Sequence, residues 1–201
     1  GYPIYEDEEN QKYVPTLSTM VLLSSMNWLN VLTAVKDSLL LPGSYMGFFA
    51  ERYRTAKQIS LVSPGKLVNV DNQLTLIKND LAHVEIWERI IDFCTDCKTI
   101  SISDDERIGY KVGEYIDGEQ LMAAASLHVI HLDAFVLSAK EKATLLCDDL
   151  FFRKLATYTK IRNINFVSLL RHYVDNGFVV PIILELSKTE WRNRPYHNKY
   201  G

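Results

Sequence analysis

The segment Ala143–Asp149, with the sequence ATLLCDD, constrains the fold of this chain more than any other. A short apolar run that ends in polar residues is typical of a strand buried in a parallel sheet. Ligands of open parallel sheets bind outside the carboxyl ends of the strands, where Asp148 and Asp149 would lie. We expect one carboxylate to face a cleft and the other to cap the next helix, although both could equally be loop and capping residues.

The rest of the chain alternates between strand-like and helix-like segments, which favours an α/β domain with a mainly parallel sheet. Around residues 59–70, β character interrupted by a Ser-Pro-Gly turn predicts a hairpin or an extended arm. Strands are expected at 19–24, 38–41, 99–103, 143–149 and 163–167, and helices at 25–35, 46–53, 77–94, 119–127, 132–142, 150–159 and 168–176.

Composition narrows the class of protein. The chain has 201 residues, 47% of them hydrophobic, which is enough for one domain with a sizeable core. Its net charge of −3 does not indicate a nucleic-acid binder overall, although a local basic face remains open. Three cysteines form an odd set, so we expect a reducing, cytoplasmic setting rather than a disulfide framework. The longest apolar run, Leu17–Leu32, contains serines and asparagines, so no membrane span or signal peptide is expected.

The segment Ala143–Ala156 resembles the late strand and helix of PIN domains, in which an aspartate ends an apolar strand and Leu, Arg and Ala follow on a helix. Asn163–Leu170 resembles the last strand and helix of that family. Met20–Leu32 and Leu39–Pro42 resemble its first two strands more loosely. The resemblance covers roughly residues 18–178 and is closest to PIN-like domains attached to helical-repeat proteins. It implies a three-layer α/β/α sandwich with a central helical or hairpin insert.

The resemblance implies three parts of the chain: a polar linker or arm at 1–17, the PIN-like domain at 18–178 with its insert at about 58–98, and a tail at 179–201. It also implies a ribonuclease that uses Mg²⁺ or Mn²⁺ and acts on single-stranded RNA. The residues that would serve it are Asp149, Asp148 and Asp133 as metal ligands, Glu51 as a supplementary catalytic acid, Arg153 and Lys154 as phosphate contacts, and His131 and Glu119 as residues of the rim.

The sequence departs from the family pattern at two expected acids. The first-strand acid should lie near Leu22–Ser24, where there is no carboxylate, and the second near Phe48, with Glu51 almost one turn later. An alternative hypothesis therefore stays open. The chain would be a catalytically inactive PIN-like module that binds RNA or a protein partner, either the rest of a larger parent protein or another subunit.

Three further patterns each have two interpretations. The pair Cys94 and Cys97 forms a CxxC, but a zinc ribbon needs a second pair, so a structural role is favoured. His128, His131 and Asp133 could bind a transition metal or could be ordinary surface residues. Several cations follow the acidic pair and form either a solvated face or a basic rim that grips a phosphate backbone: Arg153, Lys154, Lys160, Arg162 and Arg171.

Overall fold

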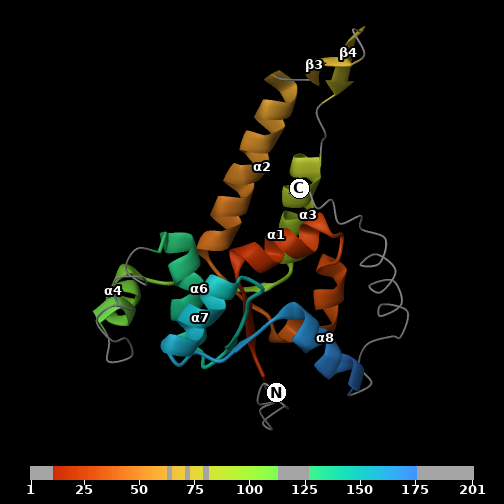
Figure 1. Cartoon of the computed structure of the whole chain (residues 1–201). Helices are drawn as coiled ribbons and strands as arrows, with labels where there is room; N and C mark the ends of the chain where they lie inside the picture. Colours follow the sequence, from red (N-terminus) through yellow and green to blue (C-terminus); the bar gives the residue numbers. More distant parts are fainter. Residues whose placement is uncertain (1–10, 63–64, 71–72, 79–81, 113–126, 176–201) are drawn as a thin grey trace, which may run out of the picture. The chain divides into compact units, whose positions relative to one another are not determined.

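The computed structural model describes residues 11–62, 65–70, 73–78, 82–112 and 127–175 (Figure 1). The chain forms two compact units, residues 1–164 and residues 165–201. The elements of the first unit are β1 (Tyr13–Pro15), α1 (Leu17–Ser25), the 3-10 helix η1 (Leu29–Ser38), β2 (Leu40–Pro42), α2 (Ser44–Val62), β3 (Gly65–Val70), β4 (Gln73–Lys78), α3 (Ala82–Thr95), β5 (Lys98–Ile100), α4 (Asp104–Val112), α6 (Val129–Lys140), β6 (Thr144–Leu146), α7 (Leu150–Tyr158) and β7 (Asn163–Ile164). The second unit contains α8 (Phe166–Asp175).

The central strands of the first unit pair in parallel. β6 lies between β1 and β7, and β2 pairs with β5. A parallel bridge between Tyr13 and Leu39 places β2 beside β1, so the strand order is β5, β2, β1, β6, β7. The expected α/β class with mainly parallel strands is therefore confirmed.

The strand order fixes where a ligand would bind. From β1 the chain first builds one side of the sheet with β2 and β5, and then crosses over to build the other side with β6 and β7. In open parallel sheets, ligands bind at such a point of reversal, outside the carboxyl ends of the two strands, which here are β1 and β6. Pro15 ends β1 and Leu146 ends β6 at this point, which we call the switch point.

Large side chains that are fully buried hold the first unit together. Leu41 comes from β2, Leu145 comes from β6, and Tyr45 and Phe49 come from α2. The Tyr45 ring contacts the Phe49 ring at 5.4 Å, and its hydroxyl donates a hydrogen bond to the Pro15 carbonyl oxygen at 3.2 Å. Burial raises the pKa of Tyr45, so the phenol remains a neutral donor that fixes α2 to the end of β1.

The expected first strand at residues 19–24 is wrong, because this segment belongs to helix α1. Leu17, Met20 and Leu23 are buried at helical spacing, and the Thr16 side chain accepts a hydrogen bond from the Thr19 amide as the N-cap. The first strand is instead β1, whose three residues are all buried and pair with β6. The segment 1–17 is therefore not a linker or arm throughout.

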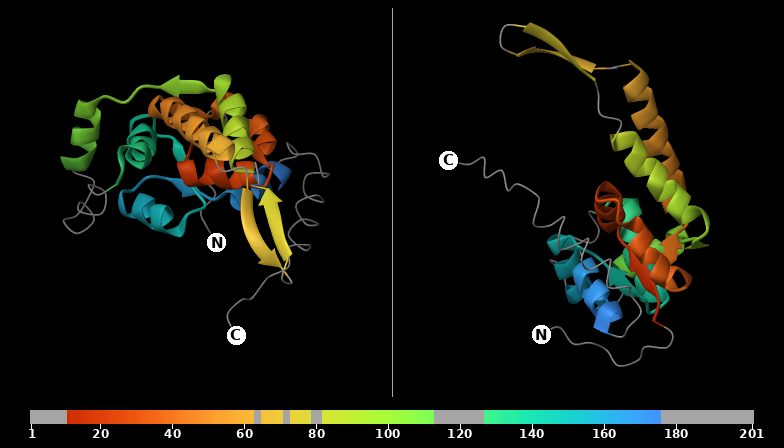
Figure 2. Two further views of the ribbon diagram at one scale, coloured as in Figure 1. Left: turned by 90° about the horizontal axis from the view of Figure 1, so that it is seen from above. Right: turned by 90° about the vertical axis from the view of Figure 1, so that its right-hand side faces the viewer.

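The central insert differs from its predicted form. Helix α2 continues to Val62, beyond the expected end, and the hairpin is formed by β3 and β4 instead of residues 59–70. Helices α2 and α3 lie side by side in both views of Figure 2, and the rings of Phe48 and Trp87 meet at 6.2 Å between them. The expected helix at 119–127 and the tail at 179–201 lie outside the described residues.

Helix α4 was not expected from the sequence. Ser103 and Glu106 begin it with a reciprocal capping box: the Ser103 amide donates to Glu106 Oε2 at 2.8 Å, and the Glu106 amide donates to Ser103 Oγ at 3.2 Å.

Within the described part of the chain, no helix has the length and apolarity needed to cross a bilayer.

Candidate functional site

The acidic pair lies at the switch point, and its two carboxylates have different partners. Asp149 is the N-cap of α7, where its Oδ1 accepts hydrogen bonds from the amides of Phe151 at 2.8 Å and Phe152 at 3.2 Å. Asp148 Oδ2 accepts a hydrogen bond from the Thr19 hydroxyl at 3.1 Å, and the Asp148 amide donates to the same hydroxyl at 3.0 Å. One acid therefore caps the helix, as expected, while the other is bound to α1.

The carboxyl end of β1 carries hydroxyl groups. Thr16, directly after the strand, donates its amide hydrogen to the Leu146 carbonyl oxygen at 2.9 Å, so it lies beside the end of β6. Its hydroxyl donates to the Thr19 hydroxyl at 3.1 Å, and both side chains are buried. The expected position of a first-strand acid, Leu22–Ser24, depended on a strand that is absent there, because those residues are in α1. The residue directly after the first strand is Thr16.

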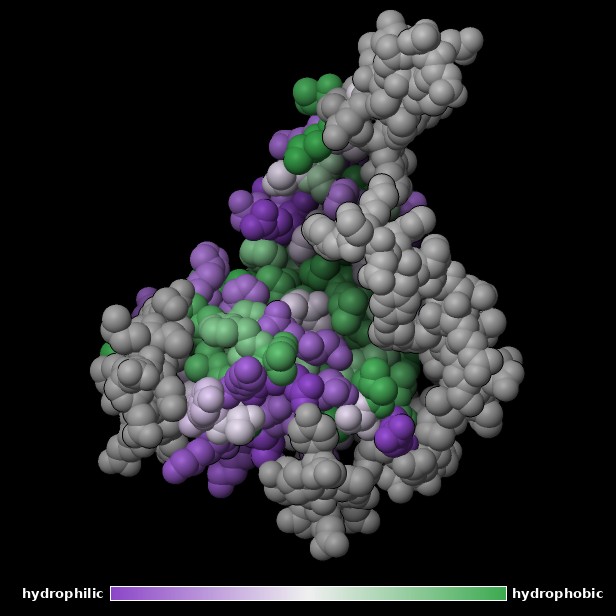
Figure 3. Space-filling view, in the orientation of Figure 1, coloured by the Kyte–Doolittle hydropathy of each residue, from purple (hydrophilic) through white to green (hydrophobic). Residues whose placement is uncertain are grey.

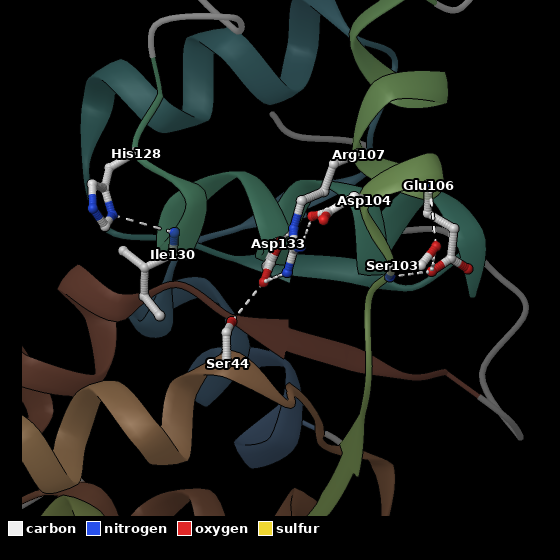
Figure 4. A network of polar contacts seen from close by, with 8 residues as sticks. All are labelled: Ser44, Ser103, Asp104, Glu106, Arg107, His128, Ile130 and Asp133. Atoms are coloured by element: carbon white, nitrogen blue, oxygen red, sulfur yellow. Dashed lines mark hydrogen bonds and ion pairs between the residues drawn. The ribbon is translucent and has the colours of Figure 1, made fainter.

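Asp133, on α6, is completely buried and is held by two side chains (Figure 4). Arg107 of α4 donates from Nε to Asp133 Oδ1 at 2.6 Å and from Nη2 to Oδ2 at 2.9 Å. Ser44, the first residue of α2, donates its hydroxyl to Oδ2 at 2.6 Å. Both carboxylate oxygens therefore have charged or hydroxyl donors supplied by the protein.

The charge of Asp133 is balanced by Arg107. The hydrogen bonds to Asp133 raise the pKa of the Arg107 guanidinium further above its ordinary value, so this group remains a cation at every accessible pH. Arg107 Nη1 also donates to the exposed Asp104 carboxylate at 2.6 Å. The guanidinium thus connects a buried acid to the surface of α4 and occupies the space beside Asp133.

The two histidines of α6 do not combine with Asp133. His128 is the N-cap of the helix, with Nδ1 accepting a hydrogen bond from the Ile130 amide at 3.4 Å. His131 stacks on Phe152 of α7, with ring centroids 4.8 Å apart. Burial, and secondarily the charge of His128, lowers the pKa of His131, so its imidazole is neutral at pH 7.

The remaining predicted site residues are spread over the surface. Glu51 lies exposed on α2 and makes no hydrogen bond or ion pair with another described residue. Arg153 is partly exposed on α7, and Lys154 is exposed on the same helix. Glu119 lies outside the described residues.

The three cysteines are buried, as structural cysteines usually are. Cys94, Cys97 and Cys147 are all buried free thiols. Burial raises the pKa of Cys147 to about 11 and that of Cys94 to about 12, and it raises the pKa of Cys97 as well. The thiolate form that binds metals and attacks disulfides is therefore suppressed at neutral pH.

The residues at the switch point do not fit a divalent cation in this arrangement. Mg²⁺ and Mn²⁺ need a set of converging oxygen ligands. Among the described residues, no group of three His, Cys, Asp or Glu side chains is placed to hold a metal ion.

Compared with protein-family models and with curated protein sequences, the chain matches none of them.

Sequence reasoning missed Arg107, Ser44 and Thr19, which donate hydrogen bonds to the acids, and Thr16, which donates to Thr19. The Ser103-x-x-Glu106 pattern is typical of a capping box and could have predicted helix α4. That helix would then have placed Arg107 in or next to its first turn. Pro15 followed by Thr16 was a readable signal for the start of α1. Which acid each of these residues meets depends on tertiary packing.

Proposed function

We propose that this chain is a PIN-like α/β/α module in which the acidic cleft is maintained by internal partners instead of by catalytic metal ions, and that it serves as a binding module within a larger protein. The observation that carries the proposal is the buried ion pair between Arg107 and Asp133. The parallel strand order and the acids after β6 support the PIN-like assignment.

The positive charge of Arg107 beside Asp133 makes hydrolysis through a metal ion at this carboxylate unfavourable. A metal-dependent nuclease needs its buried carboxylates available to cations. Here a guanidinium donates to both oxygens of Asp133, and Ser44 donates to one of them as well. A second cation at that carboxylate would face the positive charge of Arg107 at close range, which costs free energy in a buried setting.

The hydroxyl groups at the strand ends support the same conclusion. Thr16 directly follows β1, and Ser44, which begins α2, lies two residues after the end of β2, so both hydroxyl side chains follow the carboxyl ends of strands. Neutral hydroxyls bind Mg²⁺ and Mn²⁺ much more weakly than carboxylates do. The cleft therefore has fewer negative charges than a phosphodiester-cleaving site of this type requires.

A ribonuclease of the PIN type remains the second candidate, because Asp148 and Asp149 both follow a buried parallel strand at the switch point. One assay separates the two hypotheses. The purified protein is incubated with labelled single-stranded RNA and Mn²⁺, together with the variants Asp148→Asn, Asp149→Asn and, as a matched control, Asp105→Asn on the exposed surface of α4.

We expect no cleavage above the buffer blank for any of these proteins. Cleavage by the wild-type protein and by Asp105→Asn that disappears in Asp148→Asn would overturn the proposal and establish the ribonuclease. Asp149→Asn keeps a good helix cap, so its loss of activity would not be an effect of unfolding.

A further inference from the structure

The outer face of helix α7 exposes large side chains. Leu150, Phe151 and Tyr158 are 64%, 54% and 55% exposed, while Leu155 and Ala156 are buried on the inner face. Side chains three and seven positions apart lie on one side of a helix. Phe151, the exposed Lys154 and Tyr158 therefore form a row in which a cation stands between two aromatic rings.

The Phe151 ring of this row contacts further aromatic rings. Phe151 meets Phe152 edge to face at 5.5 Å, and Phe152 stacks on His131 at 4.8 Å. Phe152 also meets the buried Phe135 at 6.1 Å, which anchors the group in the core. The exposed Phe151 ring is thus supported from behind, so that little side-chain freedom is lost when a flat ligand stacks on it.

Cations are frequent in α7 and in the segment that directly follows it. From Leu150 to Arg162 the sequence contains two lysines and two arginines and no carboxylate. Arg162 donates a hydrogen bond to the Lys142 carbonyl oxygen at 2.7 Å, which brings a further exposed lysine to this region. Lys142, Lys154 and Lys160 form no ion pair with another described residue. Figure 3 shows hydrophobic and hydrophilic residues side by side where α7 lies.

The nearest acids in the sequence are already engaged. Asp148 accepts a hydrogen bond from Thr19, Asp149 caps α7, and Glu141 forms an ion pair with Lys12 at 2.9 Å. None of these acids forms an ion pair with Lys142, Lys154 or Lys160, so these exposed lysines are available to an external anion. An apolar protein partner would match the aromatic rings but would leave these charges without counterparts.

We propose that the outer face of α7 binds single-stranded nucleic acid, with bases stacking on Phe151 and Tyr158 and with phosphates contacting Lys154 and Lys160. Aromatic rings interleaved with cations recognise single strands in this way, because every base has a face that stacks and every nucleotide carries a phosphate. The inference names the partner of the proposed binding module. It does not depend on whether the cleft can hydrolyse RNA.

The test is fluorescence anisotropy with labelled single-stranded oligonucleotides of roughly 12 nucleotides, within the usual site sizes. The buffer contains EDTA and low salt, so that cleavage plays no part in the result. The variants Phe151→Leu and Tyr158→Leu keep an apolar side chain but remove the flat ring. We expect each to weaken binding by roughly 5- to 150-fold, the usual loss for one stacked base. The matched control is Ile108→Ala, which truncates an equally exposed side chain on α4 and should bind as the wild-type protein does.

A second measurement addresses the phosphates. Lys154→Gln should reduce the slope of log binding constant against log salt by about 0.7, the value for one phosphate contact on a single strand. Lys57→Gln, an exposed lysine on α2, should leave that slope unchanged. Melting curves of all variants confirm that they are folded, and DNA and RNA oligonucleotides are compared in parallel.

Two results would overturn the inference: no binding of either oligonucleotide by the wild-type protein, or unchanged binding after both leucine substitutions. The first result would favour a protein partner for this face. Neither result bears on the cleavage assay, so a failure of this inference is distinguishable from a failure of the proposed lack of hydrolysis.

Discussion

Removing Arg107 tests how the fold tolerates the acid buried in α6. In Arg107→Met the stem of the side chain remains, but among the described residues the buried Asp133 carboxylate keeps one hydrogen-bond donor, the Ser44 hydroxyl. Breaking one half of a buried ion pair costs about 3–5 kcal/mol, because the other charge is left uncompensated. Arg107 itself is 20% exposed, so water can partly replace it, and we expect the lower end, about 3 kcal/mol. For a chain of this size the melting temperature should fall by roughly 6–12 °C.

The same two helices supply a matched control. Lys140 of α6 and Glu106 of α4 form an ion pair at 2.6 Å, the same distance as the shorter contact of Arg107 with Asp133. Their side chains are 42% and 33% exposed, however, and exposed pairs contribute little. Thermal melts of Lys140→Met should therefore differ little from the wild-type protein, while those of Arg107→Met differ strongly.

A double-mutant cycle completes the experiment. Asp133→Asn removes the buried charge and keeps the volume of the side chain. The double variant Arg107→Met with Asp133→Asn should be more stable than the sum of the single effects predicts, by about 1–3 kcal/mol. If Arg107→Met melts with the wild-type protein, or if the two substitutions are additive, the pair does not stabilise the fold and the reasoning above is refuted.

Three further predictions concern other elements. Asp149→Ala should destabilise the protein by about 0.5–2 kcal/mol in urea melts, since α7 loses its cap, and Asp149→Asn should restore most of that loss. The buried Cys94, Cys97 and Cys147 should react with a thiol reagent at pH 8 no faster than the protein unfolds, and rapid labelling in native buffer would contradict their burial. Hydrogen bonds from Lys140 and from Ser103, its partner in the capping box of α4, lower the pKa of Glu106 to about 2 from an ordinary value of 4.5. The stability that Glu106 contributes is therefore present above pH 4.5 and is lost as the pH falls towards 2, so the difference in melting temperature between the wild-type protein and Glu106→Gln should shrink over that range.

The region around β6 and α7 could be predicted because its signals are local. An apolar run, an aspartate and a helix with a buried inner face follow one another directly, and the Asp149 cap confirms the boundary. The segment Met20–Leu23 could not be assigned in the same way, since four apolar residues suit a buried strand and a buried helix equally. The true first strand has three residues and ends in a proline, which is too little for a periodic pattern.

The candidate site was predictable only in part. Asp133, Asp148 and Asp149 stand out in the sequence as acids near strand ends. The residues that determine their chemistry come from far away: Arg107 is 26 positions from Asp133, and Thr19 is 129 positions from Asp148. No local sequence pattern predicts such pairings, because they depend on how the strands and helices are arranged in space.

The hydroxyl groups and Arg107 at this edge of the sheet have complementary roles: the hydroxyls donate hydrogen bonds to the acids, and Arg107 supplies positive charge. An ionised carboxylate accepts hydrogen bonds and cannot donate, so acids after β1 and β2 would repel Asp148 and Asp133 unless cations lay between them. Thr19 and Ser44 donate to those same acids, and Thr16 in turn donates to Thr19. Arg107 supplies the positive charge that hydroxyls lack. The donors and acids at this edge are thus matched within the chain, and an acid introduced at Thr16 would add a buried charge without adding a partner for it.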